Sequence, residues 1–398
     1  MTTSSRTAVC RLAVSRVISI GGGAAAYAAL MFVIYERTGS PFWLSATLLL
    51  TFGAEGLLGP IGGLVGDRFN RKWVMVWSDL AGAACFFALA LAHEPHLLLA
   101  IAFISAVAET PFWSASSAAI PCIAGEENLS RANALLTASR NLGVMLGPVL
   151  GGVMVASFGP GWVFVVNAVT FLFSAALVAS VDAPFRSEES EEHMPGLWVG
   201  FRFLIHEKVL LTIMIAWTVL VLGMGMCMVA DLPLVHSFGE GSVGYGVLIA
   251  CWGGGAVLGT VTGRWMNARN EGLFLFAGTV VMAVGTALVF VSPWFAMAVS
   301  SVLIAGVGDA ATVVAEEGIR QRRTPDAIRS RVISLSAAGW EISFAISVVV
   351  GGFAVEWIGA KAVYGVAGLL GGVAVLILLP VLRIARREAA VSQPPDAA

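Results

Sequence analysis

The sequence predicts an all-α integral membrane protein with twelve transmembrane helices, arranged as two parallel six-helix repeats. The scarcity of charge, the number of apolar segments and a match between the two halves support this fold class. Of the 398 residues, 58% are apolar and 12% are charged, and the mean hydropathy is +0.87. A soluble domain normally carries about a quarter of its residues as charged side chains. A chain this poor in charge cannot cover a soluble surface, so we expect it to lie in a bilayer.

Twelve apolar segments are candidate spans, because a transmembrane helix needs about 20 mostly apolar residues. We expect the first to be an uncleaved helix, since its apolar run is too long for a signal peptide. The candidate spans are residues 14–35, 43–65, 73–92, 97–120, 137–157, 162–181, 209–235, 244–265, 273–292, 294–315, 332–355 and 362–382. The predicted domains are an N-terminal six-helix bundle at 1–182, a cytoplasmic linker with an amphipathic stretch at 183–208, a C-terminal six-helix bundle at 209–382 and a cytoplasmic tail at 383–398.

The basic residues predict the orientation of the chain in the membrane. With the N-terminus inside and twelve spans, only Arg37 and Lys361 of the 23 Lys and Arg residues fall outside. Cytoplasmic loops are enriched in Lys and Arg, so this asymmetry favours twelve helices with both termini in the cytoplasm. Arg16 is counted among the inside residues.

The two halves of the sequence match when they are compared 200 positions apart. Arginine and glycine recur in one frame, over segments with the same predicted topology. Parallel repeats of this kind occur in secondary transporters. The matching pairs include Gly53 and Gly253, Gly63 and Gly263, Arg131 and Arg331, Gly151 and Gly351, and Gly159 and Gly359.

The connection between the second and third spans reads GLVGDRFNRKWVM at residues 63–75. Gly63 permits close helix packing, and Asp67 ends the second span beside Arg68 and Arg71. This segment resembles the loop 2–3 signature of the major facilitator superfamily. The resemblance implies a cytoplasmic charge lock, made by Asp67, Arg68 and Arg71, that opens and closes during alternating access. The alternative is that these charges only anchor the topology.

The fifth span contains GVMLGPVLGG at residues 143–152, in which small residues recur every three or four positions. Small residues at this spacing permit close helix contact in lipid. The segment resembles the antiporter signature of drug-exporting facilitators, and the whole chain resembles the drug/proton antiporter branch that includes macrolide and siderophore exporters. A role in the conformational gate is therefore expected for Gly143, Gly147, Pro148, Gly151 and Gly152; ordinary packing is the alternative.

Three acidic residues are predicted near the middle of spans: Glu55, Glu109 and Glu341. Asp79, Asp231, Asp309, Glu316 and Glu317 are placed nearer an interface. An acid in mid-bilayer costs roughly 2.5–3.5 kcal/mol of insertion free energy. We therefore expect each of these three acids to have a functional or structural role that offsets this cost.

Glu109 is the first choice for coupling protons to substrate. The family fold implies that its helix lines a central cavity, and Phe112 and Trp113 follow at i+3 and i+4 on the same side of the helix. The alternative is a neutral Glu109 bonded to a neighbouring helix. Glu55 and Glu341 could share a proton or gate the cavity, and a structural hydrogen bond is an equal alternative.

Several function classes find no support in the sequence. The chain has no GxxxxGK[ST] loop for ATP, so a proton gradient is the expected energy source, without a cofactor. Five scattered cysteines do not form a metal or disulfide pattern, and the net charge of −2 does not favour nucleic acid. No catalytic set of residues appears, so we do not expect an enzyme.

The expected function is secondary active export of a small, largely apolar compound such as a drug, an antibiotic or a secondary metabolite. The expected mechanism is proton antiport with alternating access, by a monomer in the inner membrane of a bacterium, with multidrug resistance as the phenotype. One alternative is an uncoupled or importing facilitator for a metabolite. A less favoured alternative is a membrane scaffold or sensor that transports nothing.

Overall fold

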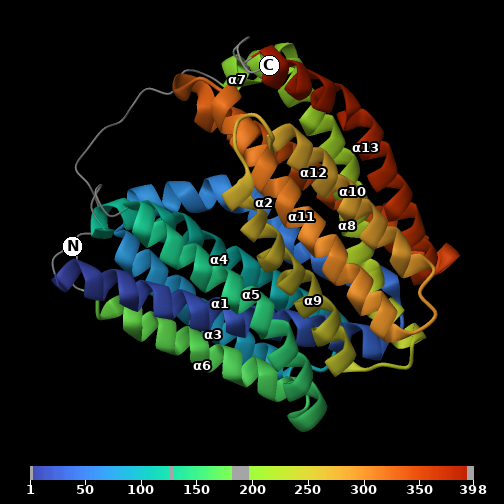
Figure 1. Cartoon of the computed structure of the whole chain (residues 1–398). Helices are drawn as coiled ribbons and strands as arrows, with labels where there is room; N and C mark the ends of the chain where they lie inside the picture. The colour runs from blue at the N-terminus through green and yellow to red at the C-terminus, as the bar shows by residue number, and fades with distance from the viewer. Residues whose placement is uncertain (1–2, 125–128, 182–196, 392–398) are drawn as a thin grey trace. The chain divides into compact units, whose positions relative to one another are not determined.

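The computed structural model describes residues 3–124, 129–181 and 197–391, and helices are the only regular elements in these ranges. The segments 183–196 and 392–398 of the predicted linker and tail lie outside the described residues. The helices are α1 (Thr3–Thr38), α2 (Pro41–Arg68), α3 (Arg71–Leu91), α4 (Pro95–Ala124), α5 (Leu129–Phe158), α6 (Pro160–Ala179), α7 (Leu197–His206), α8 (Lys208–Ser237), α9 (Ser242–Thr260), the 3-10 helix η2 (Val261–Trp265), α10 (Glu271–Phe290), α11 (Phe295–Arg323), α12 (Asp326–Ile358) and α13 (Ala360–Val391) (Figure 1).

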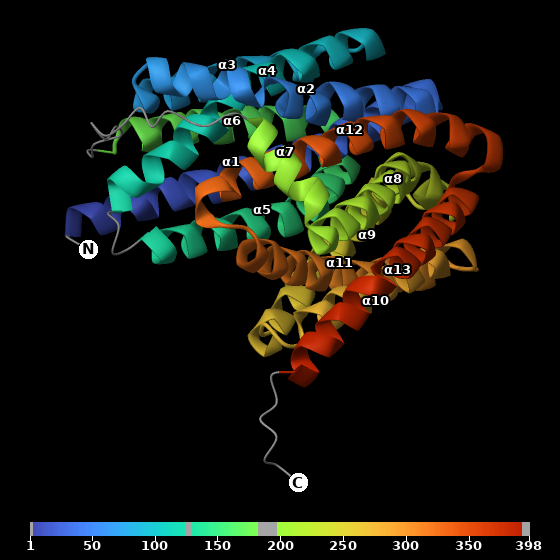
Figure 2. The ribbon, with the colours of Figure 1, turned by 90° about the horizontal axis from the view of Figure 1, so that it is seen from above.

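The helix lengths agree with a membrane protein. Within the described part of the chain, ten helices are long and apolar enough to cross a bilayer. Two shorter apolar segments, Pro41–Gly53 in α2 and Met145–Phe158 in α5, match the remaining predicted spans. The helix α7 has only 10 residues and is too short to cross a membrane. It lies against α12 (Figure 2). The predicted all-α membrane fold is confirmed.

Several helices extend beyond the apolar segments that predicted them. α11 continues to Arg323 and α12 begins at Asp326, although the apolar segments end at 315 and begin again at 332. α13 continues to Val391 rather than ending at 382. Hydropathy marks only the apolar part of a helix, whereas Glu, Arg and Ala continue it into a polar environment because they are strong helix formers. The depth of a residue must therefore be judged from the observed helix.

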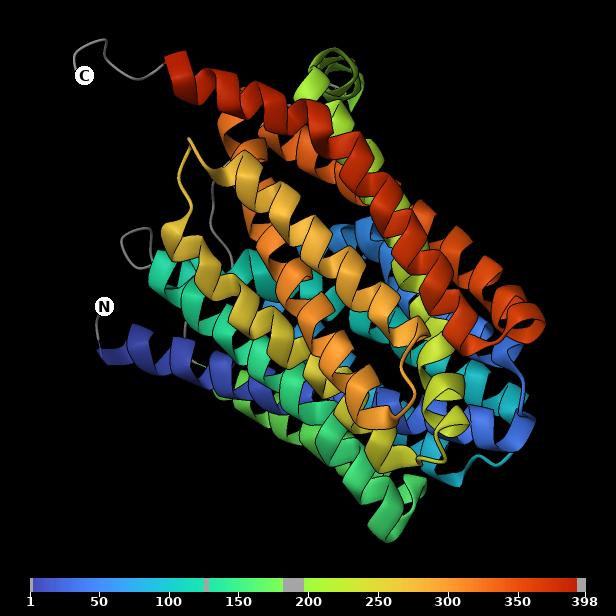
Figure 3. The ribbon, with the colours of Figure 1, turned by 45° about the vertical axis from the view of Figure 1, so that its right-hand side comes forward.

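The chain forms two compact units. The first comprises Met1–Glu191 together with Gly239–Ala250, and the second comprises Glu192–Phe238 and Cys251–Ala398. The beginning of α9 thus groups with the first unit. In that unit, α1 packs against α5 and α6, while α3 packs against α4 and α6 (Figure 3).

The second unit repeats the helix pairs of the first. α8 packs against α12 and α13, and α10 packs against α11 and α13 (Figure 2). Glycine permits the close approach of α10 to α11, since a Cβ at Gly285 would lie 2.8 Å from the carbonyl oxygen of Ser301. Leu210, Ile213 and Trp217 of α8 contribute to the buried core of this unit.

The backbone itself repeats at the interval seen in the sequence. All four glycines with positive φ in the described residues form two such pairs: Gly39 (60°) with Gly239 (78°), and Gly159 (84°) with Gly359 (82°). Glycine adopts this left-handed region without the steric penalty of other residues. Helix starts follow the same rule, since α4 begins at Pro95 and α11 at Phe295. Residues 200 positions apart therefore occupy equivalent places in the two halves.

Candidate functional site

Glu109 lies at the middle of α4, a helix of 30 residues. Its side chain is half-buried, and the hydroxyl of Ser105, one turn earlier, donates a hydrogen bond to Glu109 Oε1 over 2.8 Å. Because about 20 residues suffice to cross the apolar core, a carboxyl group at the centre of α4 lies far from both membrane faces. The mid-span position of Glu109 in a bilayer stays a prediction.

The two aromatic residues after Glu109 differ in their surroundings. Phe112 is 5% exposed and belongs to the core of the first unit, whereas Trp113 is half-buried. Their rings meet edge to face, with centroids 5.8 Å apart. Of this pair, Trp113 is therefore the one with a ring surface still accessible beside the Glu109 face of the helix.

Trp113 has an unexpected cationic neighbour. The guanidinium carbon of Arg16, on α1, lies 5.8 Å from the centroid of the Trp113 ring, within the range of a cation–π interaction. Arg16 also donates to Ser116 Oγ through Nε over 3.1 Å and through Nη2 over 2.5 Å. It is only 9% exposed, so it is a buried link between α1 and α4 and not merely a marker of the cytoplasmic side.

A second buried arginine occurs in the other unit. Arg320 Nη1 lies 3.2 Å from Glu316 Oε1, one turn earlier on α11, and Arg320 also pairs with Glu317. The guanidinium carbon lies 5.3 Å from the centroid of the Trp340 ring of α12. Glu316 and Arg320 are 5% and 8% exposed. Glu316 therefore lies in the packed interior of the second unit, and its expected depth nearer a membrane interface stays a prediction.

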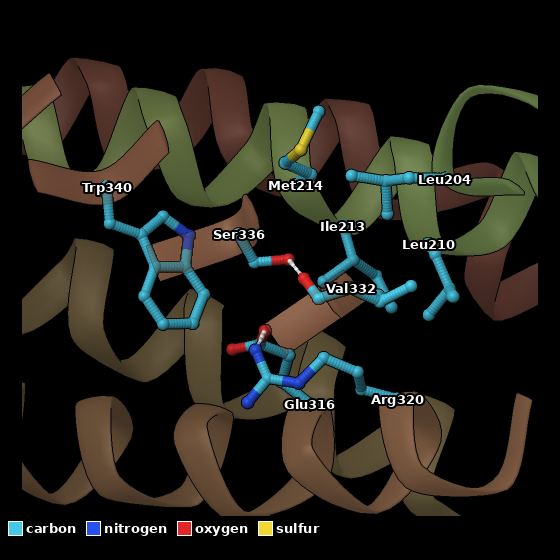
Figure 4. A pocket seen from close by; sticks show the side chains of 9 residues that line it. All are labelled: Leu204, Leu210, Ile213, Met214, Glu316, Arg320, Val332, Ser336 and Trp340. Carbon is cyan, nitrogen blue, oxygen red and sulfur yellow. Dashed lines mark hydrogen bonds and ion pairs between the residues drawn. The ribbon is translucent and has the colours of Figure 1, made fainter. Parts of the chain in front are cut away.

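This ion pair borders a small cavity between α7, α8, α11 and α12 (Figure 4). The volume of about 10 Å³ holds one water molecule at most, so the cavity is not a substrate pocket. Trp340 lies at one end, and its ring packs against Trp217 of α8 with centroids 5.6 Å apart. The remaining lining residues are Leu204, Leu210, Ile213, Met214, Val332 and Ser336.

The partners of the two buried arginines, though not the arginines themselves, are related through the repeat. Ser116 and Glu316 lie 200 positions apart, and each is bonded to an arginine that stacks on a tryptophan. In the first unit the arginine comes from α1, and in the second it comes from α11 itself. Sequence reasoning missed these contacts. Arg16 and Ser116 are 100 residues apart in the chain, and a serine in an apolar helix gives no signal of an arginine partner.

Two further acids have hydrogen-bond partners inside their units. Asp79 of α3 is 1% exposed and accepts a hydrogen bond from Ser174 Oγ of α6 over 2.7 Å. Ser174 is in turn 2.7 Å from Ser15 Oγ of α1. Asp231 of α8 accepts a hydrogen bond from the hydroxyl of Tyr364 on α13. These contacts cross-link helices, which gives both acids a structural role.

Asp309 and Glu341 differ from these cross-linking acids. Asp309 lies at the middle of the 29-residue helix α11, and its expected position nearer a membrane interface stays a prediction. It is half-buried and makes no hydrogen bond or ion pair with the described residues. Glu341 of α12 is exposed on the surface of the structure. The side chain of Glu55 lies outside the described residues, so the suggested pair of Glu55 and Glu341 stays a prediction.

The predicted charge lock is described only in part. Arg68 is exposed and Arg71 is half-buried, whereas the side chain of Asp67 and the contacts of Gly63 lie outside the described residues. Basic residues near this loop hold the end of α6: Lys72 Nζ donates to the Val181 carbonyl over 2.9 Å. Positive charge near a helix C-terminus is favourable, so Lys72 stabilises this corner of the first unit.

The glycine stripe of α5 faces α1. A Cβ at Gly147 would come within 2.6 Å of the Gly21 carbonyl oxygen, and one at Gly151 equally near that of Ala25. Gly143 likewise approaches Gly21. These glycines therefore set the distance between α1 and α5.

The end of the stripe meets the start of α9, which belongs to the same unit. Ser242 Oγ donates to the Gly152 carbonyl over 3.0 Å, and Gly246 lies against the carbonyl of Pro148. Pro148 is buried within α5, and the helix continues through it. A contribution of these residues to gating stays a prediction.

Within the described residues, no group of three or more His, Cys, Asp or Glu side chains is placed to hold a metal ion. The polar groups that the helices do bring together are the acid, hydroxyl and arginine clusters described above. They can hold or release a proton and form ion pairs.

Comparison with known proteins agrees with this picture. The sequence profile of the Major Facilitator Superfamily matches residues 12–271 and 232–397. A candidate bacilysin exporter, BacE, of Bacillus subtilis is 23% identical over 338 residues, which cover 83% of this chain and 84% of that protein. The enterobactin exporter EntS of Shigella boydii is 27% identical over 319 residues, covering 77% of this chain and 75% of EntS.

Solved structures share the fold at low sequence identity. The nucleoside transporter NupG superposes with a TM-score of 0.71 at 13% identity, covering 95% of this chain and 98% of NupG. A bacterial homologue of the iron transporter ferroportin, in an inward-facing state, gives 0.73 at 16% identity, covering 93% and 98%.

The profile spans nearly the whole chain, the two relatives are named as exporters, and the helices form two matching units. The chain therefore belongs to the Major Facilitator Superfamily and is a multi-pass membrane transporter, not an enzyme.

Proposed function

We propose that this transporter exports a small, largely apolar compound in exchange for protons, and that Glu109 carries the exchanged proton. The observation that carries the proposal is a half-buried carboxyl group at the centre of α4, bonded to Ser105. A buried carboxylate is costly, so such acids in membrane helices generally serve ion or proton pathways. Export is supported by the relatives named for bacilysin and enterobactin.

Protons are the preferred coupling ion for a physical reason. Removing a carboxyl group from water disfavours its charged form, so a small change of surroundings can load or release a proton. A charge that crosses a potential of 100 mV gains about 2.3 kcal/mol, which is sufficient to drive export. Ser105 can donate to the charged form of Glu109, and its hydroxyl can rotate when the acid is protonated.

Trp113 supports an apolar substrate. Its half-buried ring lies one turn after Glu109 and is oriented by Arg16, which is fixed on Ser116. An aromatic surface beside a titratable acid can hold an apolar or weakly basic compound. Arg16 also supplies a fixed positive charge about 10 Å along the helix axis from Glu109, since the seven residues from Glu109 to Ser116 rise by about 1.5 Å each.

The remaining parts of the proposal concern movement and location. The residues Asp67, Arg68 and Arg71 act as the lock at the cytoplasmic end, and the α5 glycines let α1 and α5 shift at close range. The protein works as a monomer in the bacterial inner membrane. Both termini lie in the cytoplasm, because its basic residues are concentrated on that predicted side.

The test uses inverted membrane vesicles with an acidic lumen, and bacilysin and enterobactin as separate probes. The expected result is accumulation of a probe in the lumen together with loss of the proton gradient, followed by a fluorescent pH dye. Glu109→Gln keeps the size and polarity of the side chain but removes the titratable proton. We expect it to abolish both signals.

Glu356→Gln is the matched control, because Glu356 is exposed near the end of α12. It should transport as the unaltered protein does. Proton-coupled uptake that persists in Glu109→Gln would contradict the role of Glu109. Uptake without any proton movement would instead favour an uncoupled facilitator, and proton movement in the opposite direction would favour an importer.

A further inference from the structure

The repeat gives Glu109 a counterpart. α4 and α11 begin 200 positions apart, at Pro95 and Phe295, and the glycine turns Gly159 and Gly359 keep the same interval. Position 309 is therefore equivalent to position 109, and it holds another carboxylic acid, Asp309. Each half of the protein thus places one acid at the centre of its fourth long helix.

Asp309 lies on an inward side of α11. Its neighbours in sequence make the contacts with adjacent helices: Gly308 approaches Met282 of α10, and Ala310 approaches Gly259 of α9. Glu316 follows seven residues later, close to two full turns, so it lies on the same side as Asp309. Since Glu316 borders the cavity towards α8 and α12, this side of α11 is the interior side.

The described side chains of the surrounding helices offer Asp309 no ion-pair partner. The titratable side chain of α10 is Glu271, which is paired with Arg322. α9 carries Cys251 and Tyr245, and α8 carries Cys227, His236, Lys208 and Asp231, of which the last is bonded to Tyr364. α12 carries Glu341 at its middle, Arg329 and Arg331 near its start, and the exposed Glu356 near its end. The short helix η2, which also packs against α11, carries Arg264, an exposed residue that lies over the Trp265 ring.

Asp309 is half-buried and has no partner in the described part of the chain that would offset the cost of a buried charge. A mid-bilayer carboxylate costs roughly 2.5–3.5 kcal/mol on insertion scales, and Asp309 has no hydrogen bond or ion pair among the described residues to offset that cost. Asp79 and Asp231 show the contrast, because each is bonded to a hydroxyl of another helix. A bound proton is the simplest remaining means of neutralising Asp309.

We propose that Asp309 is a second proton-carrying acid of the transport cycle, equivalent to Glu109 in the other half of the chain. The inference rests on the proposed proton antiport. It adds that two carboxyl groups, one in each unit, bind and release protons. Asp309 differs from Glu109 in lacking a local donor such as Ser105, because position 305 is alanine.

The first test does not depend on a substrate. Infrared spectra of the purified full chain in lipid nanodiscs, recorded through a pH titration, report protonated carboxyl groups by their C=O stretching band. We expect Asp309→Asn to remove one component of this band and Glu109→Gln to remove another. Asp309→Glu should keep a shifted component, and Glu356→Gln should leave the buried components unchanged.

The second test measures protons moved per probe molecule in the inverted vesicles, with bacilysin and enterobactin as probes. Asp309→Asn should halve this ratio, and Asp309→Glu should restore it.

Spectra of a folded Asp309→Asn variant that match the unaltered protein at every pH would overturn the inference. So would an unchanged proton ratio in Asp309→Asn while Glu109→Gln abolishes coupling, although the proposed function would then stand. Failure of the unaltered protein to move protons with either probe would instead count against the proposed function, and the infrared result would still decide whether Asp309 holds a proton.

Discussion

Arg320→Met is expected to lower the free energy of unfolding by about 3–5 kcal/mol, because it removes one partner of a buried ion pair. Glu316 is 5% exposed and would keep its carboxyl group in the packed interior of the second unit. The substitution also removes the cation from the face of Trp340. The measurement is the thermal unfolding midpoint in detergent, followed by tryptophan fluorescence.

The double variant Glu316→Leu with Arg320→Met should recover most of this loss. Replacing both members of a buried pair by apolar side chains is often neutral or stabilising. The matched control is Arg264→Met, which removes an exposed arginine lying 4.1 Å from the Trp265 ring centroid. We expect a loss of about 0.5–1 kcal/mol there. A double variant as unstable as Arg320→Met would contradict this account and show that packing of the arginine stem matters more than its charge.

The fold was predictable because its main determinants are local. Apolar runs of sufficient length predict spans without knowledge of their partners, and glycine at positions 39, 159, 239 and 359 occupies turns that require positive φ. The 200-residue interval visible in the sequence reappears in the helix boundaries. The one systematic error was helix length, because helical backbone continues past the apolar segment wherever Arg, Glu and Ala follow it.

The expected depth of Asp309 depended on the same helix boundary. Ending its span at 315 put the residue near a membrane face, whereas α11 continues to Arg323 and has Asp309 at its centre. Comparison with Glu109 through the repeat would have found the residue from sequence alone. A sequence repeat can therefore correct a helix boundary taken from hydropathy, when the boundary is clearer in one half of the chain than in the other.

Neither hydropathy nor the sequence repeat could predict the arginine clusters. Arg16 and Ser116 are 100 residues apart, and Arg16 looks like any basic residue at the start of a span. Glu316 and Arg320 have helical spacing, yet that spacing does not distinguish a solvated pair from a buried one. Burial of this pair depends on the packing of three helices, which places Trp340 against Arg320 and Trp217 against Trp340.

Gly151→Val should lower the free energy of unfolding by about 1–3 kcal/mol, the usual range for overpacking a close contact. An added Cβ would lie 2.6 Å from the Ala25 carbonyl oxygen and 2.8 Å from its Cα. These are backbone atoms of α1, so the conflict is relieved only by separating the two helices, and no side chain can rotate away. The same unfolding measurement in detergent reports the effect.

Gly23→Val is the control for that substitution, because a Cβ at Gly23 meets no atom within 4 Å. Glycine and valine differ little in helix propensity, so the free energy of unfolding of this variant should be close to that of the unaltered protein.

Comparing stability with transport also separates packing from gating. A Gly151→Val protein that unfolds normally but fails to transport would show that α1 and α5 tolerate a wider spacing at rest and need the glycine only when they move. Equal losses of stability and transport would instead assign Gly151 to the static contact between α1 and α5.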